Sequence, residues 1–242
     1  MNEDKLIGRN AVAEGLKSGR IIDKILIKQG EREGSIKKIL ADAKEQKIIV
    51  QEVSKQKLDE IASNHQGVIA LCATHDYVEV EDILAVSQKR GEDPFIVILD
   101  NIKDPHNLGA IMRTAECAGV HGIIIPKRRS VGLTSVVSKT SAGAIEYMPV
   151  ARVTNISSTI DMLKKQNIWV VSADLGGKEY FKQDLKGGIA VVIGSEGEGV
   201  GRLISEKCDF TVSIPMAGKI TSLNASVAAG LIMYEVVRQR IG

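Results

Sequence analysis

The sequence predicts an α/β protein made of a small N-terminal unit and a larger C-terminal domain built on a parallel sheet. Its 242 residues are enough for one large domain, or for one medium and one small domain. The chain is 44% hydrophobic and can therefore bury a core. From Phe95 onward, short apolar runs alternate with segments of helical periodicity, which is typical of parallel strands connected by helices.

Residues 1–76 are predicted to form the small α/β unit. Helices are expected at Asn10–Leu16 and Ser35–Glu45, and a third helix is expected to begin after Ser54, a residue type that caps helices. Strands are expected at the apolar runs Ile22–Ile27, Ile48–Val53 and Val68–Ala73. Up to Val80, acidic and basic residues number thirteen each, so this part of the chain carries no net charge.

The segment 77–94 is expected to be a linker, which places the second domain at 95–242. The segment is charged and contains one short helical pattern, Val80–Val86. It ends in Arg90–Pro94, which is rich in turn-forming residues. Few contacts usually cross such a segment, so the domain boundary is placed here.

The second domain opens with Phe95–Leu99, a fully apolar run of the kind buried on both faces of a parallel sheet. Further strands are expected at Gly122–Ile125, Ile168–Ala173, Ile189–Ile193 and Phe210–Ile214. Helices are expected at Gly109–Ala118, Leu133–Lys139, Ser157–Lys165 and Ser222–Arg240. The alternation predicts a sheet with helices on both faces.

Composition narrows the possible functions. A net charge of +2 is too small to indicate nucleic-acid binding by itself, so any RNA contact must come from local clusters. Aromatic residues make up only 3% of the chain, which argues against base stacking as the main mode of recognition. No signal peptide or apolar run long enough for a membrane span is apparent, so a soluble cytoplasmic protein is expected.

Cysteine and histidine spacing predicts no metal site. The cysteines are far apart and are expected to be small buried hydrophobes in a reducing compartment. The histidines do not cluster at metal-ligand spacing either. The residues concerned are Cys72, Cys117, Cys208, His65, His75, His106 and His121.

Three loops follow predicted strands, at the edge where open α/β sheets bind ligands. The first, Asp100–Gly109, leads into a helix for which Asn107 is a candidate N-cap. The second, Ile193–Gly201, is rich in glycine but matches neither the dinucleotide nor the phosphate-loop pattern. The third, Ile214–Ser226, leads into a helix for which Ser222 is the candidate cap.

Together, these loops resemble the three signature motifs of the SpoU family, the ribose methyltransferases of the knotted SPOUT class. The matching stretches are Asn107–Glu116, Val192–Gly197, Ile214–Gly218 and Ser222–Ala229, which agree with the family in order and spacing. One departure is Ala225, where valine is more usual. The resemblance covers about residues 95–240 and implies a deep trefoil knot in this domain, although threaded chains are rare.

The resemblance also implies the cofactor, the site residues and a homodimer with each active site near the subunit interface. The cofactor is S-adenosyl-L-methionine. The residues implied in its binding are Gly194, Glu196, Ile214, Met216, Leu223, Asn224 and Ser226. The residues implied in catalysis are Arg113, Asn107, Glu196, Ser222 and Asn224.

The N-terminal unit resembles the ribosomal-protein-like RNA-binding domain of one branch of this family. Gly8–Val12 and His65–Val68 carry the likeness, and Lys139–Ala144 with Pro149–Val153 also looks like that branch. The branch methylates a guanosine of large-subunit (23S) ribosomal RNA, so structured RNA is the expected partner. The expected RNA contacts are Arg9, Asn10, His65, Gln66, Lys127, Arg128, Arg129 and Lys139.

Methyl transfer to a ribose oxygen requires that the hydroxyl be positioned and that its proton leave. The family gives the role of base to Arg113. However, a guanidinium has a pKa above about 12 and stays protonated in proteins. We therefore expect Arg113 to bind the RNA phosphate and polarise the 2′-hydroxyl, while Glu196 orients Arg113 or Asn224.

Three other functions remain open from the sequence. A transfer-RNA ribose methyltransferase of the same family is disfavoured by the N-terminal unit. A non-catalytic RNA-binding factor in ribosome assembly is disfavoured because Asn107, Arg113, Glu196 and Asn224 occur together. An enzyme for a small nucleotide is disfavoured because no phosphate-loop pattern is found.

Overall fold

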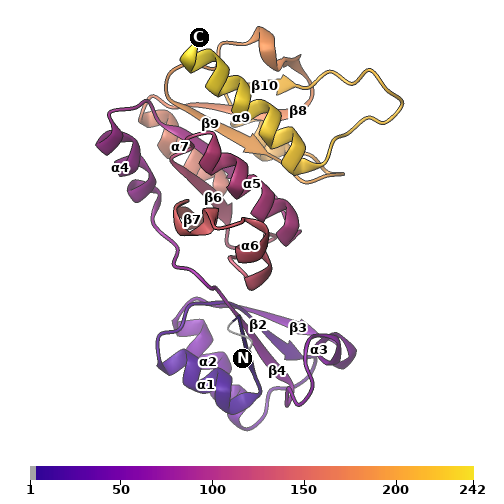
Figure 1. Cartoon of the computed structure of the whole chain (residues 1–242). Helices are drawn as coiled ribbons and strands as arrows, with labels where there is room; N and C mark the ends of the chain where they lie inside the picture. Colours follow the sequence, from indigo (N-terminus) through magenta and orange to yellow (C-terminus); the bar gives the residue numbers. More distant parts are fainter. Residues whose placement is uncertain (1–3) are drawn as a thin grey trace. The chain divides into compact units, whose positions relative to one another are not determined.

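The computed structural model describes residues 4–242, which form two compact units (Figure 1). Unit 1 comprises residues 4–76 together with Gly132–Ser135. Unit 2 comprises Tyr77–Val131 and Val136–Gly242. Within the described residues, no helix is both long and apolar enough to cross a membrane.

Unit 1 is built on a four-stranded mixed sheet in the order β1-β4-β2-β3. Strand β2 pairs with β3 in parallel, and β4 runs antiparallel to both β1 and β2. The strands are β1 (Lys5–Ile7), β2 (Ile22–Lys28), β3 (Ile49–Val53) and β4 (Val68–Cys72). The sequence predicted three of them, while the short β1 was not expected.

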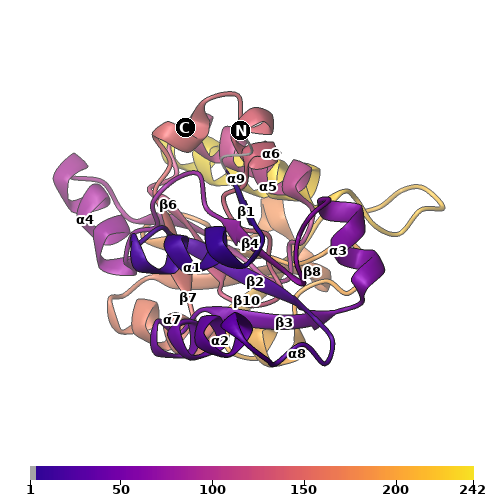
Figure 2. The same ribbon diagram turned by 90° about the horizontal axis from the view of Figure 1, so that it is seen from below.

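Helices cover both faces of this sheet. Successive side chains of β2 point to opposite faces, and apolar residues on both faces need to be covered. Ile25 and Ile27 pack with α1 (Arg9–Lys17) and α2 (Ser35–Glu45), which lie side by side (Figure 2). Leu26 packs instead with Leu58 of α3 (Lys55–Ile61). The side chain of Ser54 accepts a hydrogen bond from the Lys57 amide and caps α3, as the sequence predicted.

Unit 2 is built on a six-stranded parallel sheet in the order β10-β8-β9-β5-β6-β7. The central strands β5 and β9 are fully buried, which explains their uniformly apolar sequences. Because every strand runs in the same direction, all six carboxyl ends lie along one edge. The strands are β5 (Phe95–Leu99), β6 (Gly122–Pro126), β7 (Val150–Val153), β8 (Trp169–Glu179), β9 (Ile189–Ile193) and β10 (Phe210–Ser213).

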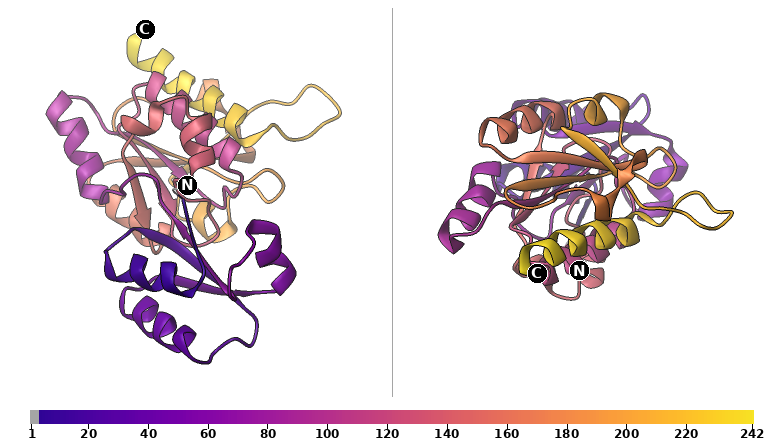
Figure 3. Two further views of the ribbon diagram at one scale, coloured as in Figure 1. Left: turned by 60° about the horizontal axis from the view of Figure 1, so that its bottom comes forward. Right: turned by 90° about the horizontal axis from the view of Figure 1, so that it is seen from above.

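Two layers of helices enclose the sheet. On one face, α4 (Val80–Arg90) and α7 (Ile156–Lys165) bury apolar side chains against the strands. On the other face, α5 (Pro105–Cys117) packs against the C-terminal helix α9 (Ala225–Ile241), drawn in yellow in Figure 3. The remaining elements are short: α6 (Ser135–Thr140), η1 (Ala144–Glu146), η2 (Tyr180–Lys182) and α8 (Arg202–Ser205).

The segment 77–94, expected to be a linker, is instead packed into unit 2. Val80 and Ile83 of α4 belong to the core of that unit. The Val78 amide donates to the carbonyl of Val150 over 3.0 Å, which extends the edge of the sheet next to β7. The charged residues that suggested a linker occupy the solvent side of an amphipathic helix, and its apolar side was underestimated.

The cysteines differ in their surroundings. Cys72 is buried and Cys208 is half-buried, whereas Cys117 at the end of α5 is exposed, contrary to the expectation of three buried thiols. Burial raises the pKa of the Cys72 thiol, and it raises the pKa of Cys208 to about 11. Both thiols therefore stay protonated near neutral pH and are poor nucleophiles.

Candidate active site

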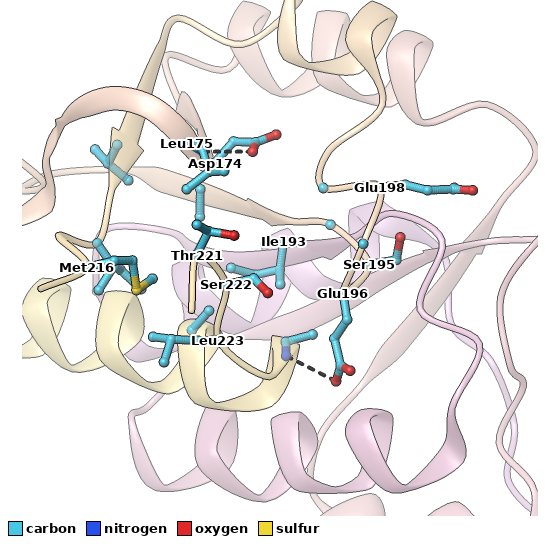
Figure 4. Close-up of a pocket in the computed structure, with 18 residues that line it drawn as sticks. Asp174, Leu175, Ile193, Ser195, Glu196, Glu198, Met216, Thr221, Ser222 and Leu223 are labelled. Carbon is cyan, nitrogen blue, oxygen red and sulfur yellow. Dashed lines mark hydrogen bonds between the residues drawn. The ribbon is translucent and has the colours of Figure 1, made fainter. Parts of the chain in front are cut away.

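A pocket of about 500 Å³ opens at the carboxyl edge of the unit 2 sheet (Figure 4). This volume lies within the range of about 300–1,000 Å³ that is usual for small-molecule sites. The middle of β8, the end of β9 with the loop after it, and the loop before α9 form its walls. Of the residues that the sequence predicted for cofactor binding or catalysis, the pocket is lined by Gly194, Glu196, Ile214, Met216, Ser222 and Leu223.

The loop after β5 delivers Asn107 to the edge of this site. Helix α5 begins at Pro105, and its N-cap is Asp104, whose carboxylate accepts a hydrogen bond from the His106 amide over 2.9 Å. Asn107 was expected to be the cap, but it lies in the first turn of the helix. Proline is favoured at the first helical position, which moves the cap to the residue before it. The Asn107 amide is therefore free to bond elsewhere.

The loop after β9 is a tight turn that depends on two glycines. A Cβ atom on Gly194 would lie only 2.0 Å from the carbonyl carbon of Gly199. The Gly199 amide donates to the Ser195 carbonyl over 3.0 Å, and Gly199 itself has a φ of 64°. Close backbone packing thus explains why these positions are glycine, and the turn presents Glu196 at the rim of the pocket.

The loop before α9 extends from the sheet as a long arm (Figures 1 and 3). The cap of α9 is Asn224 rather than Ser222. The side-chain oxygen of Asn224 accepts from the Ser226 amide over 2.9 Å and from the Ser226 hydroxyl over 2.6 Å. Asparagine caps as well as serine does, so Ser222 stays exposed in the pocket wall.

One hydrogen-bonded group, which we call the rim group, joins the three loops: Asn107, Glu196 and Asn224. Oε1 of Glu196 accepts from the side-chain amide of Asn107 over 2.8 Å and from that of Asn224 over 2.6 Å. The Asn224 amide also donates to Oδ1 of Asn107 over 2.9 Å. A longer bond of 3.4 Å runs from the Ala225 amide to Glu196, shown dashed in Figure 4. The sequence predicted these three residues as site residues, and the fold brings them together.

Arg113 stands apart from the rim group. Its side chain is exposed and makes no hydrogen bond or ion pair with any described residue. It lies six residues beyond Asn107, about 9 Å along the helix axis and on a different side of α5. The chain therefore leaves this guanidinium available to a partner molecule.

A second, shallow groove runs beside the main pocket between α5 and α9. Val227, Leu231 and Tyr234 are exposed apolar residues on one side of α9 in this groove. Ser226, expected to contact the cofactor, lines this groove and not the pocket. The other lining residues are Thr114, Tyr180, Gly230 and Glu235.

In unit 1, Arg9, His65 and Gln66 share one concave surface. Nε of Arg9 donates to the Gln66 carbonyl over 3.0 Å, and its guanidinium bridges to Glu31 at 2.6 Å. His65 is only 6% exposed, with its Nδ1 accepting from the Gly67 amide and its Nε2 3.0 Å from Asp59. Both ring nitrogens are therefore used to hold the turn, which leaves them no bond to offer to RNA.

The other residues expected to contact RNA are exposed. Asn10 is the neighbour of Arg9 on α1, and Lys139 lies in the last turn of α6. Lys127, Arg128 and Arg129 form an exposed turn after β6. The guanidinium of Arg152 donates to the Lys127 carbonyl over 3.2 Å and helps to hold this turn.

The sequence did not predict several residues of the pocket wall. Strand β8 carries a bulge, because the consecutive residues Thr211 and Val212 of β10 pair with Ser172 and Lys178. Residues 173–177 therefore leave the β10 ladder, which brings Ala173, Asp174 and Leu175 into the pocket. The Gly176-Gly177 pair within this strand was the available sign of a bulge. Glu198 and Thr221 also line the pocket.

The pocket suits a ligand that carries positive charge. Among the described residues that line it, Asp174, Glu196 and Glu198 are acidic and none is Lys, Arg or His. In residues 4–242, no group of three or more His, Cys, Asp or Glu side chains is arranged to hold a metal ion.

The parallel sheet and the pocket at its carboxyl edge place this chain in the class of α/β proteins that bind small molecules at the ends of their strands. The profile of the SpoU rRNA methylase family matches residues 94–234. A second profile, RNA 2′-O ribose methyltransferase substrate binding, matches residues 5–78. The chain therefore belongs to the SpoU rRNA methylase family, as the resemblance of its motifs predicted.

Individual relatives support this membership over nearly the whole chain. The TrmH family tRNA/rRNA methyltransferase YacO of Bacillus subtilis (strain 168) is 52% identical over 98% of this chain and 96% of its own. A TrmH family tRNA/rRNA methyltransferase of Staphylococcus aureus (strain MSSA476) is 50% identical over 99% of this chain and 98% of its own. The protein is thus a methyltransferase of the TrmH/SpoU type that acts on RNA.

A solved structure shows the same fold. The SpoU methyltransferase AviRb of Streptomyces viridochromogenes, in complex with the cofactor AdoMet, matches with a TM-score of 0.63 and 25% identity. The match covers 98% of this chain and 90% of that one. The α/β fold predicted from the sequence, with its parallel sheet, is confirmed.

Proposed function

We propose that this protein transfers the methyl group of S-adenosylmethionine to the ribose 2′-hydroxyl of a guanosine in 23S ribosomal RNA. The observation that supports this most is the rim group: a carboxylate and two amides, drawn from three distant loops, meet at the edge of an acidic pocket. A small cofactor in the pocket would place its reactive end beside groups that can hold an acceptor.

The pocket fits S-adenosylmethionine in size, polarity and charge. Ile214, Met216 and Leu223 give an apolar wall for the adenine ring. The three carboxylates favour a ligand with a sulfonium and an ammonium group. When bound, this cofactor supplies a methyl group activated for in-line displacement. Gly194 would allow the ligand to approach the backbone closely.

The residues around the pocket position the acceptor. Glu196 holds both amides of the rim group through one oxygen, which fixes the three loops relative to one another. Arg113 offers five N–H donors and has no partner among the described residues, so it binds the phosphate next to the target ribose and polarises the hydroxyl. Ser222 in the pocket wall adds a hydroxyl beside the acceptor.

Two features of architecture belong to the same proposal. We infer a homodimer through the exposed apolar side of α9, because Val227, Leu231 and Tyr234 would otherwise face water. Thr114 lines the groove between α5 and α9, and Arg113 is the residue before it on α5. A partner subunit in this groove would therefore lie near the residue that is proposed to bind the RNA. We also infer the trefoil knot, which fits a chain that runs from edge strand β10 back to pack α9 against α5.

We infer ribosomal RNA rather than transfer RNA as substrate, because unit 1 resembles the RNA-binding domain of the branch that methylates large-subunit ribosomal RNA. The match of unit 1 to a substrate-binding profile supports a role in recognition. In the described part of unit 1, Arg9 and Lys28 with Glu31 and Asp59 form a mixed-charge concave surface. Transfer RNA is the second candidate, because the relatives carry both substrates in their names.

The test combines the purified protein with RNA mapping. Labelled S-adenosylmethionine should transfer its methyl to 23S RNA fragments but not to DNA of the same sequence, because DNA lacks the 2′-hydroxyl. Ribose methylation should then be mapped in ribosomal and transfer RNA from cells with and without the gene. Loss of one guanosine mark in 23S RNA supports the proposal, whereas loss of a transfer-RNA mark alone selects the second candidate. Equal labelling of DNA would rule out a ribose acceptor.

A further inference from the structure

Asp174 lies in the pocket but outside the three loops that carry the family's motifs. It is placed there by the bulge in β8, beyond the point where Ala173 pairs with Ile193 of β9. Its register neighbour on β9 is therefore Gly194, the first residue of the glycine turn. Figure 4 shows Asp174 and Leu175 on the wall across from Glu196 and Leu223.

Two backbone bonds hold the Asp174 carboxylate. Its Oδ2 accepts from the Val200 amide over 3.1 Å, and its Oδ1 accepts from the Leu175 amide over 2.7 Å. A Cβ on Gly199 would lie 2.8 Å from Oδ2, so the carboxylate packs directly on the glycine turn. A carboxylate has about four acceptor positions, and these bonds use two of them. The half-buried group is thus fixed in place with acceptor capacity left over.

The other two carboxylates of the pocket are different. Oε1 of Glu196 is occupied by the two amides of the rim group. Glu198 is exposed at the tip of the turn and makes no hydrogen bond with any described residue, so nothing fixes its orientation. Asp174 is fixed by the backbone at the point where β8 leaves its ladder with β10, and it keeps unused acceptor positions on the wall across from Glu196.

We propose that Asp174 binds the ribose of the cofactor, with its carboxylate accepting hydrogen bonds from the 2′- and 3′-hydroxyls; this rests on the proposed use of S-adenosylmethionine. A vicinal diol presents two donors at a spacing that one carboxylate can accept. Acidic residues near glycine turns at the strand ends of other α/β sheets bind ribose hydroxyls in this way. Asp174 thereby fixes the adenosine half of the cofactor, while the rim group lies on the opposite wall.

Two simpler roles make different predictions. If Asp174 only holds the glycine turn through Val200, its replacement weakens every ligand of the pocket by the same factor. If it acts only through its negative charge, its replacement weakens the cationic S-adenosylmethionine and spares its neutral-sulfur product, S-adenosylhomocysteine. A ribose contact instead weakens both ligands and loses its effect when the hydroxyls are missing.

The experiment is calorimetric titration of the full-length wild type, Asp174→Asn and Glu198→Gln. The ligands are S-adenosylmethionine, S-adenosylhomocysteine, and the 2′-deoxy and 3′-deoxy forms of S-adenosylhomocysteine. Asp174→Asn keeps one oxygen, which can accept from the Val200 amide while the bond from the Leu175 amide is lost. Glu198→Gln removes the same charge from the same pocket. We expect Asp174→Asn to weaken both parent ligands about 10-fold or more, the loss typical of charge-assisted bonds, and the deoxy forms by clearly less. Glu198→Gln should not discriminate parent from deoxy ligands.

Three results would overturn the inference while leaving the proposed function intact. These are no change in affinity for Asp174→Asn, an equal loss for parent and deoxy ligands, and a loss confined to S-adenosylmethionine. If Asp174→Asn does not fold, titration of the wild type alone tests the inference. Each deoxy ligand must then bind to the wild type about 10-fold more weakly than its parent. A wild type that binds none of these ligands would reject the proposed function together with this inference.

Discussion

The two edges of the unit 2 sheet use polar side chains in opposite ways. At the amino edge, His121 and Arg240 form hydrogen bonds with the backbone and hold the chain together. At the carboxyl edge, Arg113 and Glu198 are exposed and make no hydrogen bond with any described residue. An arginine, Arg240, therefore stabilises the fold at the amino edge, whereas another arginine, Arg113, is available to a ligand at the carboxyl edge.

The amino edge is organised by His121 and Arg240. The His121 side chain is fully buried, its Nδ1 accepts from the Phe95 amide over 2.9 Å, and its Nε2 lies 2.9 Å from Glu92. Arg240, near the end of α9, donates to the carbonyls of Asp93, Pro94 and Gly187. Its guanidinium also lies over the Phe95 ring at 5.1 Å. These contacts tie the last helix to the loops that precede β5 and β9.

At the carboxyl edge, Arg113 has no partner among the described residues, and in the rim group Glu196 and Asn224 are exposed while Asn107 is half-buried. A buried polar group without a partner is costly, whereas an exposed one is hydrated until a ligand binds. The Arg240 guanidinium meets this requirement through its two terminal nitrogens, while its buried Nε has no partner among the described residues. The comparison predicts that changes at the carboxyl edge alter activity without altering stability, and that changes at the amino edge do the reverse.

The largest expected effect is on turnover by Arg113→Ala. We expect methyl transfer to RNA to fall by about 10²-fold or more, because a donor that polarises the acceptor is lost. Arg113→Lys should also be poor, because an ammonium lacks the two-pronged geometry of a guanidinium. Cofactor affinity by calorimetry and the melting temperature should stay near those of the wild type. A large loss of cofactor affinity would move Arg113 into the cofactor site.

A smaller effect, on stability, is expected for Arg240→Ala. Three backbone carbonyls lose a charged donor, so the free energy of unfolding should fall by about 2–4 kcal/mol. Urea unfolding measures this change, and cofactor affinity at low urea should be preserved. Arg202→Ala is the control, because its ion pair with Glu206 is exposed and is worth less than about 1 kcal/mol. Equal losses in the two variants would break the comparison.

The smallest effect concerns pH. Burial lowers the pKa of His121 below its ordinary value of 6.5, and Nδ1 must be unprotonated to accept from Phe95. The unfolded chain therefore binds the proton more readily, so the contribution of His121 is complete above pH 6.5 and is lost as the pH falls below it. The slope is at most about 1.4 kcal/mol per pH unit. In His121→Gln, the fall in melting temperature between pH 7.5 and 5.5 should be smaller than in the wild type; an unchanged fall would contradict this role.

The sequence predicted best those elements that are defined by their own periodicity. The helix Ser35–Glu45 and the strands Phe95–Leu99 and Ile189–Ile193 were predicted with the bounds that the structure has. Local capping was harder, because several residues near a helix start can act as caps. Asp104 and Asn224, rather than Asn107 and Ser222, cap α5 and α9, and the choice depends on which residue the loop brings to the helix axis.

Site residues that belong to continuous sequence motifs were predicted. A site residue whose position depends on the pairing of two strands was missed. Asn107, Glu196 and Asn224 stand in recognisable stretches, and the fold joins them. Asp174 stands in a strand whose pairing with β10 breaks. The Gly176-Gly177 pair signals a bulge in this strand but does not specify which side chains the bulge turns into the pocket. His65 is the opposite case: it belongs to a recognisable motif, but its side chain is buried and accepts a hydrogen bond from the Gly67 amide in the same turn.

The turn after β9 also constrains how this gene can change. A Cβ on Gly194 would collide with the backbone of Gly199, and a Cβ on Gly199 would collide with the carboxylate of Asp174, so neither glycine can gain a side chain while its neighbour stays in place. Gly197, between them, has no atom within 4 Å of its absent side chain and no left-handed backbone. A side chain at position 197 would therefore fit the fold, but it would enter the space of the pocket, because Gly197 lines it. Positions 194 and 199 are linked in a different way, because a side chain at either one would collide with neighbouring atoms of the fold.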